Sequence, residues 1–293
     1  MSARARFRPD PLEAAQQRQR ARLPFFVGDA PAGSVALDHL PWLQRHAPWL
    51  TVSAQAITLD LPAPQRDEAL GELHQRLRHD GLLLGWRDEI FPIWDIRTGA
   101  VLARIERCAA RFWGSLTRGA HCNGYVADDQ GRPQRLWVAR RSPHKSTDPN
   151  RLDNLVGGGV PHGQTPHEAL VREAWEEAGL RPEQVATVQS HGIVELHRDI
   201  PEGCQWEWLY VYDLPLSAQV VPQNQDGEVA EFFSVDANGL LEVALSGEMT
   251  VDAAVVSLDF AWRHQWVPPH LHDDIGQRLA RLLRTPACTP LRA

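Results

Sequence analysis

The segment over residues 157–180, GGGVPHGQTPHEALVREAWEEAGL, constrains the fold of this chain more than any other. Its three glycines are followed by Thr165, Pro166 and Glu168. Thr165 and Glu168 have the spacing of a capping box, and Pro166 falls at the first helical position, where its missing N–H is not needed. Gly179 supplies a left-handed stop. The segment therefore predicts a glycine loop that leads directly into a short helix.

The predicted helix carries three carboxylates close together. At about 100° per residue, Glu173, Glu176 and Glu177 fall within an arc of roughly 100° on one side. An apolar stripe next to them can face a core: Leu170, Ala174 and Ala178. The carboxylates repel one another, and hard divalent cations such as Mg²⁺ or Mn²⁺ would relieve the repulsion. The alternative for an acidic helix end is a solvated face without a ligand.

The whole segment resembles the Nudix box, G-x5-E-x7-R-E-U-x-E-E-x-G-U, where U is a bulky aliphatic residue. The matching residues are Gly158, Arg172, Glu173, Glu176, Glu177, Gly179 and Leu180. Gln164 stands where the family usually has its first glutamate, and Ala174 replaces the bulky aliphatic residue. The first departure removes one outer contact to a metal or an arginine and leaves the R-E-x-x-E-E cluster complete.

This resemblance implies a catalytic group of Arg172, Glu173, Glu176 and Glu177, with Arg172 positioning a glutamate. The implied metal ligands are the Gly157 carbonyl, the three helix glutamates and one carboxylate from outside the box. For that last ligand Glu228 is favoured over Glu231, and the metal is expected to be Mg²⁺ or Mn²⁺. Glu173 is left open as ligand or base.

Residues that bind the substrate are expected in two places. Gly158 and Gly159 have no side chains, so their backbone can approach a phosphate closely. Arg140, Arg141 and Lys145 follow an expected strand and could meet phosphate oxygens. Exposed charges at a strand end are the equally common alternative for these cations.

The bulk properties exclude several classes of protein. A net charge of −7 argues against a general nucleic-acid binder. No run approaches the roughly 20 apolar residues of a membrane span, and no apolar segment follows the basic N-terminus as in a secretory signal. The four cysteines lack metal or disulfide spacing and fit a reduced, cytoplasmic protein: Cys108, Cys122, Cys204 and Cys288.

The resemblance implies an α/β fold, a Nudix-like α/β/α sandwich with a mixed sheet, over residues 119–293. A smaller α+β domain is expected over residues 1–118. Hydrophobic spacing predicts helices over residues 11–23, 65–79, 101–116, 250–264 and 271–284. A strand hairpin is expected on either side of the turn DDQGRPQ.

Three further segments resemble one subgroup within this family: LLLGWRDEIFPIWD, HCNGYV and RLDNLVGGGV. That subgroup of the Nudix family includes the Nudix portion fused to fungal thiamine pyrophosphokinase, and it has plant and bacterial members. This implies hydrolysis of thiamine diphosphate, or of its oxidised forms, to the monophosphate. Flat rings would need aromatic walls and a few polar contacts. The weaker candidates for these are Trp86, Trp94, Trp206, Trp208, Asp88, Glu89, His121 and Asn123.

Alternatives stay open at this point. The substrate could be a nucleoside diphosphate derivative such as 8-oxo-dGTP, ADP-ribose or NADH. Isopentenyl diphosphate isomerase shares the fold and would use a cysteine, for which Cys122 is the candidate. A ligand sensor built on a degenerate Nudix fold belongs to a different class and predicts a broken box. The partner is expected to be a small-molecule diphosphate, and a homodimer is possible.

Overall fold

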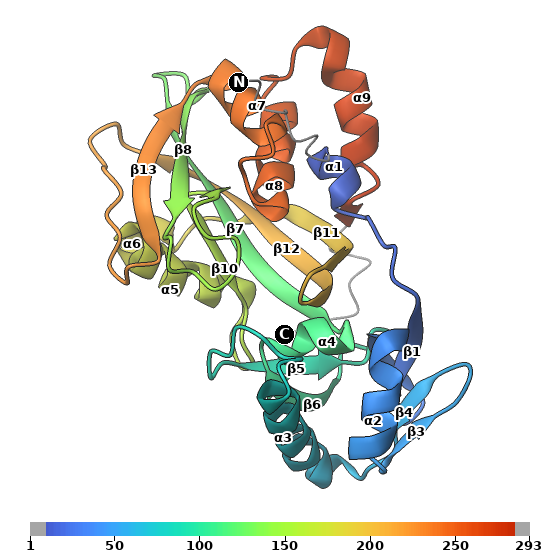
Figure 1. The fold of residues 1–293 in the computed structure, drawn as a ribbon. Coiled ribbons are helices and arrows are strands. Elements are labelled where there is room, and N and C mark those ends of the chain that lie inside the picture. The colour runs from blue at the N-terminus through green and yellow to red at the C-terminus, as the bar shows by residue number, and fades with distance from the viewer. Residues whose placement is uncertain (1–9, 285–293) are drawn as a thin grey trace, which may run out of the picture.

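The computed structural model describes residues 10–284, and two packed regions are visible in Figure 1. The sequence interpretations that concern residues 1–9 and Cys288 lie outside the described residues. The first region reaches to about residue 115, and the second contains the glycine loop and the acidic helix.

The first region packs a four-stranded sheet, of order β2-β1-β4-β3, and a separate hairpin against its helices. Phe25, Leu70 and Trp113 are among the fully buried residues that join these layers. The elements are β1 (Arg22–Val27), β2 (Ala30–Ala36), the 3-10 turn η1 (Leu37–His39), α2 (Leu40–His46), β3 (Leu50–Val52), β4 (Ile57–Leu59), α3 (Ala63–His79), β5 (Ile90–Trp94), β6 (Val101–Glu106) and α4 (Ala109–Trp113).

The second region is built on an eight-stranded mixed sheet, in which β7 and β12 run parallel and the other pairs are antiparallel. Its strands are β7 (Leu116–Ala127), β8 (Pro133–Arg141), β9 (Leu152–Asp153), β10 (Val156–Gly159), β11 (Ser190–Ile200), β12 (Gly203–Leu216), β13 (Val229–Val235) and β14 (Leu283–Arg284). The path through the sheet is β13-β8-β7-β12-β11-β14, with β10 paired to β7 and β9 to β8.

Helices cover both faces of this sheet. On one face α5 (Pro166–Ala178) and α6 (Pro182–Val185) close a core around Ala120, Cys122 and Tyr212. On the other, α7 (Ala237–Leu245), α8 (Val251–Arg263) and α9 (Pro269–Leu279) cover a second core. The expected α/β/α sandwich with a mixed sheet and an additional N-terminal domain is confirmed.

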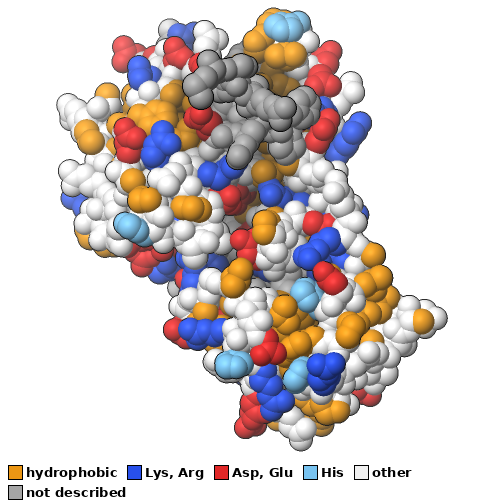
Figure 2. Space-filling view, viewed as in Figure 1, with side chains coloured by type: hydrophobic (Ala, Val, Ile, Leu, Met, Phe, Trp, Pro, Cys, Tyr) orange, Lys and Arg blue, Asp and Glu red, His pale blue; other side chains and the backbone are white. Residues whose placement is uncertain are grey.

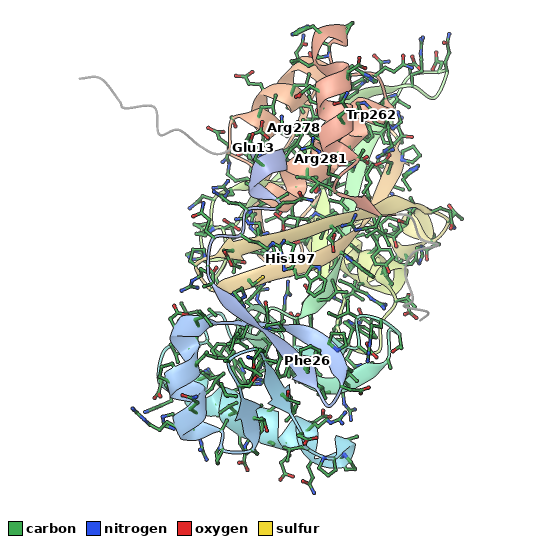
Figure 3. The ribbon with its side chains drawn as sticks, turned by 90° about the vertical axis from the view of Figure 1, so that its right-hand side faces the viewer. Glu13, Phe26, His197, Trp262, Arg278 and Arg281 are labelled. Atoms are coloured by element: carbon green, nitrogen blue, oxygen red, sulfur yellow. The ribbon has the colours of Figure 1, made fainter. Side chains whose placement is uncertain are left out.

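The start of the described chain belongs to the second core rather than to the first region. Helix α1 (Pro11–Ala14) buries Leu12 against α8 and α9. Figure 3 shows Glu13 of α1 facing Arg278 of α9 and Arg281 just after that helix, and Arg278 also pairs with Asp10 at 2.6 Å. The chain then runs beside β11, where the N–H groups of His197 and Asp199 donate to the carbonyls of Ala15 and Gln17, before it enters β1.

Three of the predicted helices are wrong in part. The helix expected over residues 101–116 is β6 followed by α4, because Ala103 and Ile105 alternate into the core while β6 pairs with β5. The helix expected over residues 11–23 is limited to α1, and Arg22 begins β1. The helix expected over residues 271–284 ends at Leu279, and the chain then pairs with β11.

In residues 10–284 no helix is both long and apolar enough to cross a membrane. Figure 2 shows acidic and basic side chains interspersed over the visible face, without a large area of one sign.

Candidate active site

The glycine loop and the helix after it form as the sequence predicts. Thr165 Oγ1 accepts a hydrogen bond from the Glu168 N–H at 3.2 Å, and Glu168 Oε2 accepts one from the Thr165 N–H at 2.8 Å. Gly179 ends α5 in the left-handed region, with φ of 65°. The apolar stripe predicted on α5 is buried in the core below the sheet. Packing of that stripe turns the acidic side of α5 toward β10.

Two of the three box glutamates lie against the glycine loop. Glu177 Oε2 accepts a hydrogen bond from the Gly157 N–H at 2.9 Å, and its side chain is 6% exposed. Glu173 lies under Gly158, where an added Cβ would overlap the carboxylate. A larger residue at 158 would force Glu173 to move from this position, which gives the box glycine a steric explanation.

Glu176 lies at the open edge of the site. Its side chain is 38% exposed, and Arg172 Nη1 donates to it at 2.6 Å. The same guanidinium donates to Glu173 through Nη2 at 2.9 Å. Arg172 therefore contacts two glutamates of one helix face, and its role in positioning them stays a prediction from the sequence.

Lys145 and Glu228 approach the glutamates from neighbouring loops. Lys145 Nζ lies 3.3 Å from Glu177 Oε1, contacts Glu228 directly, and is almost fully buried. Glu228 also pairs with Arg87 of the first region at 3.7 Å. A chain of opposite charges thus connects Glu177 to Arg87 in the first region.

The electrostatics of the loop favour a further cation. Burial raises the pKa of Glu177 to about 7, an effect that Glu173 and Asp153 strengthen and Lys145 opposes. Burial also raises the pKa of Glu173, against the opposing effect of Arg172 and Arg107. Buried carboxylates with raised pKa values gain from a cation that neutralises the ionised form.

The donor set fits a hard divalent ion, although the described residues do not gather three ligands around one point. Glu173, Glu176 and Glu177 offer carboxylate oxygens from one helix, and Glu228 reaches toward the same place. Oxygen donors of this kind suit Mg²⁺ and Mn²⁺. Lys145 and Arg172 supply the neutralising charge in this arrangement.

A cleft of about 210 Å³ opens beside the glycine loop, between the two regions of the fold. Gly157, Gly158 and Gly159 form part of its floor. The first region contributes Leu84, Gly85, Arg87, Arg107, Cys108 and Arg111. The sheet, its hairpin and α8 contribute His121, Arg141, Asp153, Arg198, Glu202, Gln205, Glu207 and Asp252, among others.

The two regions are in tight contact at this cleft. A Cβ at Gly159 would lie 2.8 Å from Phe91 Cζ and 3.2 Å from Arg107 Cζ. The His162 N–H donates to the Ile90 carbonyl at 2.8 Å. The glycine loop is therefore packed directly against the first region.

Other residues predicted for the site lie elsewhere. Arg140 does not line the cleft, and its Nε donates to the exposed Glu231 at 3.2 Å. The tryptophans predicted as ring walls do not line it either, which corrects that expectation. Trp206 and Trp208 both donate to Glu195, and Trp94 stacks under Arg118. These three rings pack between strands instead, and Trp86 stacks under Arg78 of α3.

Sequence reasoning missed several charged residues of the cleft. Arg107, Arg111, Arg198 and Asp252 are far from the box in sequence and belong to no motif. Among residues 10–284, none forms an ion pair or hydrogen bond with the side chain of Arg198. Only the fold brings these residues together.

The similarities to known protein families agree with the sandwich fold and with the glycine loop and acidic helix of the site. Residues 118–254 match the family model of the NUDIX domain, and residues 7–117 match a Domain of unknown function (DUF4743). The chain therefore contains a Nudix domain, over residues 118–254. The region that packs on the glycine loop is thus the domain without an assigned function, and residues 118–254 are the Nudix domain.

Two plant proteins are similar over most of the chain. Nudix hydrolase 20, chloroplastic, of Arabidopsis thaliana is 34% identical over 76% of this chain and 60% of its own length. Nudix hydrolase 24, chloroplastic, of the same plant is 35% identical over 72% of this chain and 57% of its own. The chain spans about 60% of the length of the first of these relatives.

A solved protein from Deinococcus radiodurans covers 57% of this chain and 97% of its own at 27% identity, with a TM-score of 0.43.

Proposed function

We propose that the protein is a divalent-metal-dependent hydrolase that cleaves an organic diphosphate. The observation that supports this most strongly is the position of Glu173 and Glu177, held against the glycine loop that forms part of the floor of the cleft. The box glutamates, Glu228 and Lys145 do not line the cleft themselves. An intact carboxylate set beside a ligand-sized space is what hydrolysis of a diphosphate needs. Mg²⁺ or Mn²⁺ is the proposed ion.

Each site residue has a proposed role. Glu173, Glu176, Glu177 and Glu228, with the Gly157 carbonyl, would hold the ion, and Arg172 would orient two of these glutamates. A bound divalent ion would neutralise the diphosphate charge and acidify the attacking water. The bare backbone of Gly158 and Gly159 would let phosphate oxygens come close, and Lys145 would contribute a positive charge. Arg140 remains a predicted phosphate contact, although it lies outside the cleft.

We further propose that the organic part of the substrate lies in the cleft, between the Nudix domain and the N-terminal domain. The proposed division of the chain stays at residues 1–118 and 119–293. Arg107 and Arg111 of the N-terminal domain and Arg198 of β11 face this space. Among the described lining residues there is no Trp, Tyr or Phe, so polar and ionic contacts would dominate recognition. The N-terminal domain would thereby act as one wall of the substrate site.

Thiamine diphosphate or its oxidised forms remain the substrates predicted from the sequence resemblance. Nucleoside diphosphate derivatives are the second candidate class, and the Nudix domain match over residues 118–254 supports diphosphate chemistry for both. Neither plant relative is named for a substrate. A cytoplasmic location and a homodimer stay predictions from the sequence.

Two other functions fit the structure less well. An isomerase that uses Cys122 is disfavoured because the thiol is buried below the sheet beside α5, where burial raises its pKa. A non-catalytic sensor would not need three box carboxylates, and it would bind a ligand in the cleft without turnover.

The experiment measures monophosphate release with Mg²⁺ over a panel of thiamine diphosphate, oxythiamine diphosphate, oxothiamine diphosphate, 8-oxo-dGTP, ADP-ribose and NADH. Preference for thiamine compounds would support the narrower proposal. Preference for a nucleotide would keep the chemistry and remove the thiamine assignment. Tight binding of one compound without any turnover would support a sensor.

The cleft is tested with a matched pair of arginines in the N-terminal domain. Arg111 lines the cleft and pairs with Glu207 at 3.7 Å, whereas Arg104 pairs with Asp67 at 2.8 Å on the exposed surface. We expect Arg111→Gln to raise KM for the best panel substrate about tenfold, while Arg104→Gln leaves it unchanged. Equal KM values in both variants would contradict a substrate in the cleft.

A further inference from the structure

A buried chain of polar side chains runs through the sheet of the Nudix domain and ends at the cleft. Arg263 Nη1 donates to Asp213 Oδ2 at 2.5 Å, and Asn123 Nδ2 donates to Asp213 Oδ1 at 3.0 Å. Asn154 Nδ2 then donates to Asn123 Oδ1 at 3.1 Å. At the far end, Asn154 Oδ1 lies 2.9 Å from His121 Nδ1. The three residues between Arg263 and His121 are at most 6% exposed.

The direction of every hydrogen bond in this chain follows from its first carboxylate. Burial alone would raise the pKa of Asp213, but contacts with His264, Arg263 and Asn123 hold it at about 2. Asp213 is therefore ionised and can only accept, so Asn123 must turn its NH₂ group toward it. The Asn123 oxygen then faces Asn154 and accepts from its NH₂ group.

The side-chain amide of Asn154 is held in one orientation. Its NH₂ group donates to Asn123 and also to the buried Ser257 Oγ at 3.1 Å. Its oxygen, which can only accept, is the atom that faces His121 Nδ1. Nδ1 must consequently carry a proton, and the neutral ring has its lone pair on Nε2.

His121 is placed so that Nε2 can meet a ligand. The residue lines the cleft and pairs with Gly157 across the β7–β10 ladder. In the described part of the chain no side chain or backbone group hydrogen-bonds its Nε2. The ring is thus fixed on its buried side and unsatisfied on the side of the cleft, next to the glycine loop.

We propose that His121 is a specificity-determining residue, whose Nε2 accepts a hydrogen bond from an N–H or O–H group of the substrate just beyond its diphosphate. Its tautomer is set by the positioning residues Asp213, Asn123 and Asn154. The substrate contact rests on the proposed function, because that places the substrate in the cleft. The tautomer does not, since it follows from the protein's own hydrogen bonds.

The tautomer is measured first, by ¹⁵N NMR of the ring-labelled full-length protein without substrate, at a pH where the His121 ring is neutral. We expect a protonated, pyrrole-type Nδ1 and a pyridine-type Nε2. Asp213→Asn should disturb this pattern, because an amide in place of the carboxylate can donate as well as accept and no longer dictates the amide directions. Asp259→Asn should preserve it, since Asp259 pairs with Arg263 without touching Asn123. A protonated Nε2 in the wild type would overturn the assignment without any variant.

The substrate contact is measured by kinetics on the best member of the diphosphate panel. His121→Asn keeps an amide donor near the position of Nδ1 and removes Nε2, so KM should rise about tenfold with kcat within about threefold. His121→Gln restores a polar atom near Nε2 and should recover part of the loss. His79→Gln, at an exposed histidine of α3, is the control.

The outcomes separate the two proposals. An unchanged KM in His121→Asn, with an active wild type, would overturn the contact and leave the proposed function standing. A wild type that hydrolyses no panel member would overturn the contact together with the proposed function. The NMR result would still decide the tautomer in that case.

Discussion

At the scale of single residues, Glu177 takes part in most of the interactions that build the site. It accepts the Gly157 N–H, contacts Lys145, and is almost completely buried. A buried carboxylate is stable only where it is paired or hydrogen-bonded. The backbone N–H and the ammonium group meet that need here, so the carboxylate can be kept beside the loop without exposure to water.

We predict that Glu177→Gln lowers kcat by about 100-fold or more with the fold intact. The amide keeps the shape of the side chain but not the negative charge that would hold a divalent ion, and even the outer partners of metal ligands are worth roughly 10–100-fold. The measurement is turnover with saturating Mg²⁺, alongside circular dichroism. Glu231→Gln, at a carboxylate that is 58% exposed, is the control. Near-normal turnover in Glu177→Gln would contradict the site assignment.

Gly158→Ala is predicted to displace Glu173. The new methyl group would overlap that carboxylate, so activity should fall steeply and stability should drop by about 1–3 kcal/mol. Turnover and urea unfolding give the two values. Gly71→Ala provides the comparison, because a Cβ at Gly71 of α3 meets nothing within 4 Å. We expect Gly71→Ala to raise the free energy of unfolding by roughly 0.5–1 kcal/mol, because alanine is favoured over glycine inside a helix.

At the scale of elements, α5 forms where the sequence predicts because its signals are local. The cap, the proline at the first turn and the left-handed glycine each act within four residues. Strand β6 carries no such signal, and its residues have helical as well as alternating spacing. These residues form a strand because pairing with β5 satisfies their backbone hydrogen bonds and buries Ala103 and Ile105.

Thr165→Ala is predicted to destabilise the protein by about 1 kcal/mol. The variant removes the acceptor for the Glu168 N–H and breaks the capping box. Urea unfolding measures the change, with Thr165→Ser as the control because serine keeps the hydroxyl. A loss of equal size in both variants would show that the methyl group, not the hydrogen bond, contributes the stability.

At the scale of the whole molecule, the buried His74 makes stability depend on pH. Burial lowers its pKa to about 3, and its Nε2 accepts a hydrogen bond from Trp113 Nε1 at 2.8 Å. Below a pH of about 6.5 the unfolded chain takes up a proton on this residue and the folded chain does not. The stability that His74 contributes is therefore complete above a pH of about 6.5 and is lost as the pH falls toward about 3.

We predict that the free energy of unfolding falls by about 1.4 kcal/mol for each pH unit below pH 6.5, which makes the decrease roughly 2 kcal/mol at pH 5. Urea unfolding at pH 7 and pH 5 gives the change for the wild type and for His74→Gln, whose amide oxygen can still accept from Trp113. Titrations shared by both proteins cancel in the comparison. An equal change in the two proteins would exclude His74 as the source.

The sequence by itself determined the Nudix domain, the glycine loop, the capped helix and the carboxylates on one side of it. These features depend on contacts within a few residues, so their spacing is visible in the chain. Only the tertiary structure decided that Lys145 lies against Glu177, and that Arg107, Arg111, Arg198 and His121 share a cleft. It also decided that the tryptophans pack elsewhere and that a chain of hydrogen bonds connects Asp213 to the ring of His121. Those contacts join residues up to about ninety positions apart along the chain, and no local spacing encodes which distant side chains a fold will bring together.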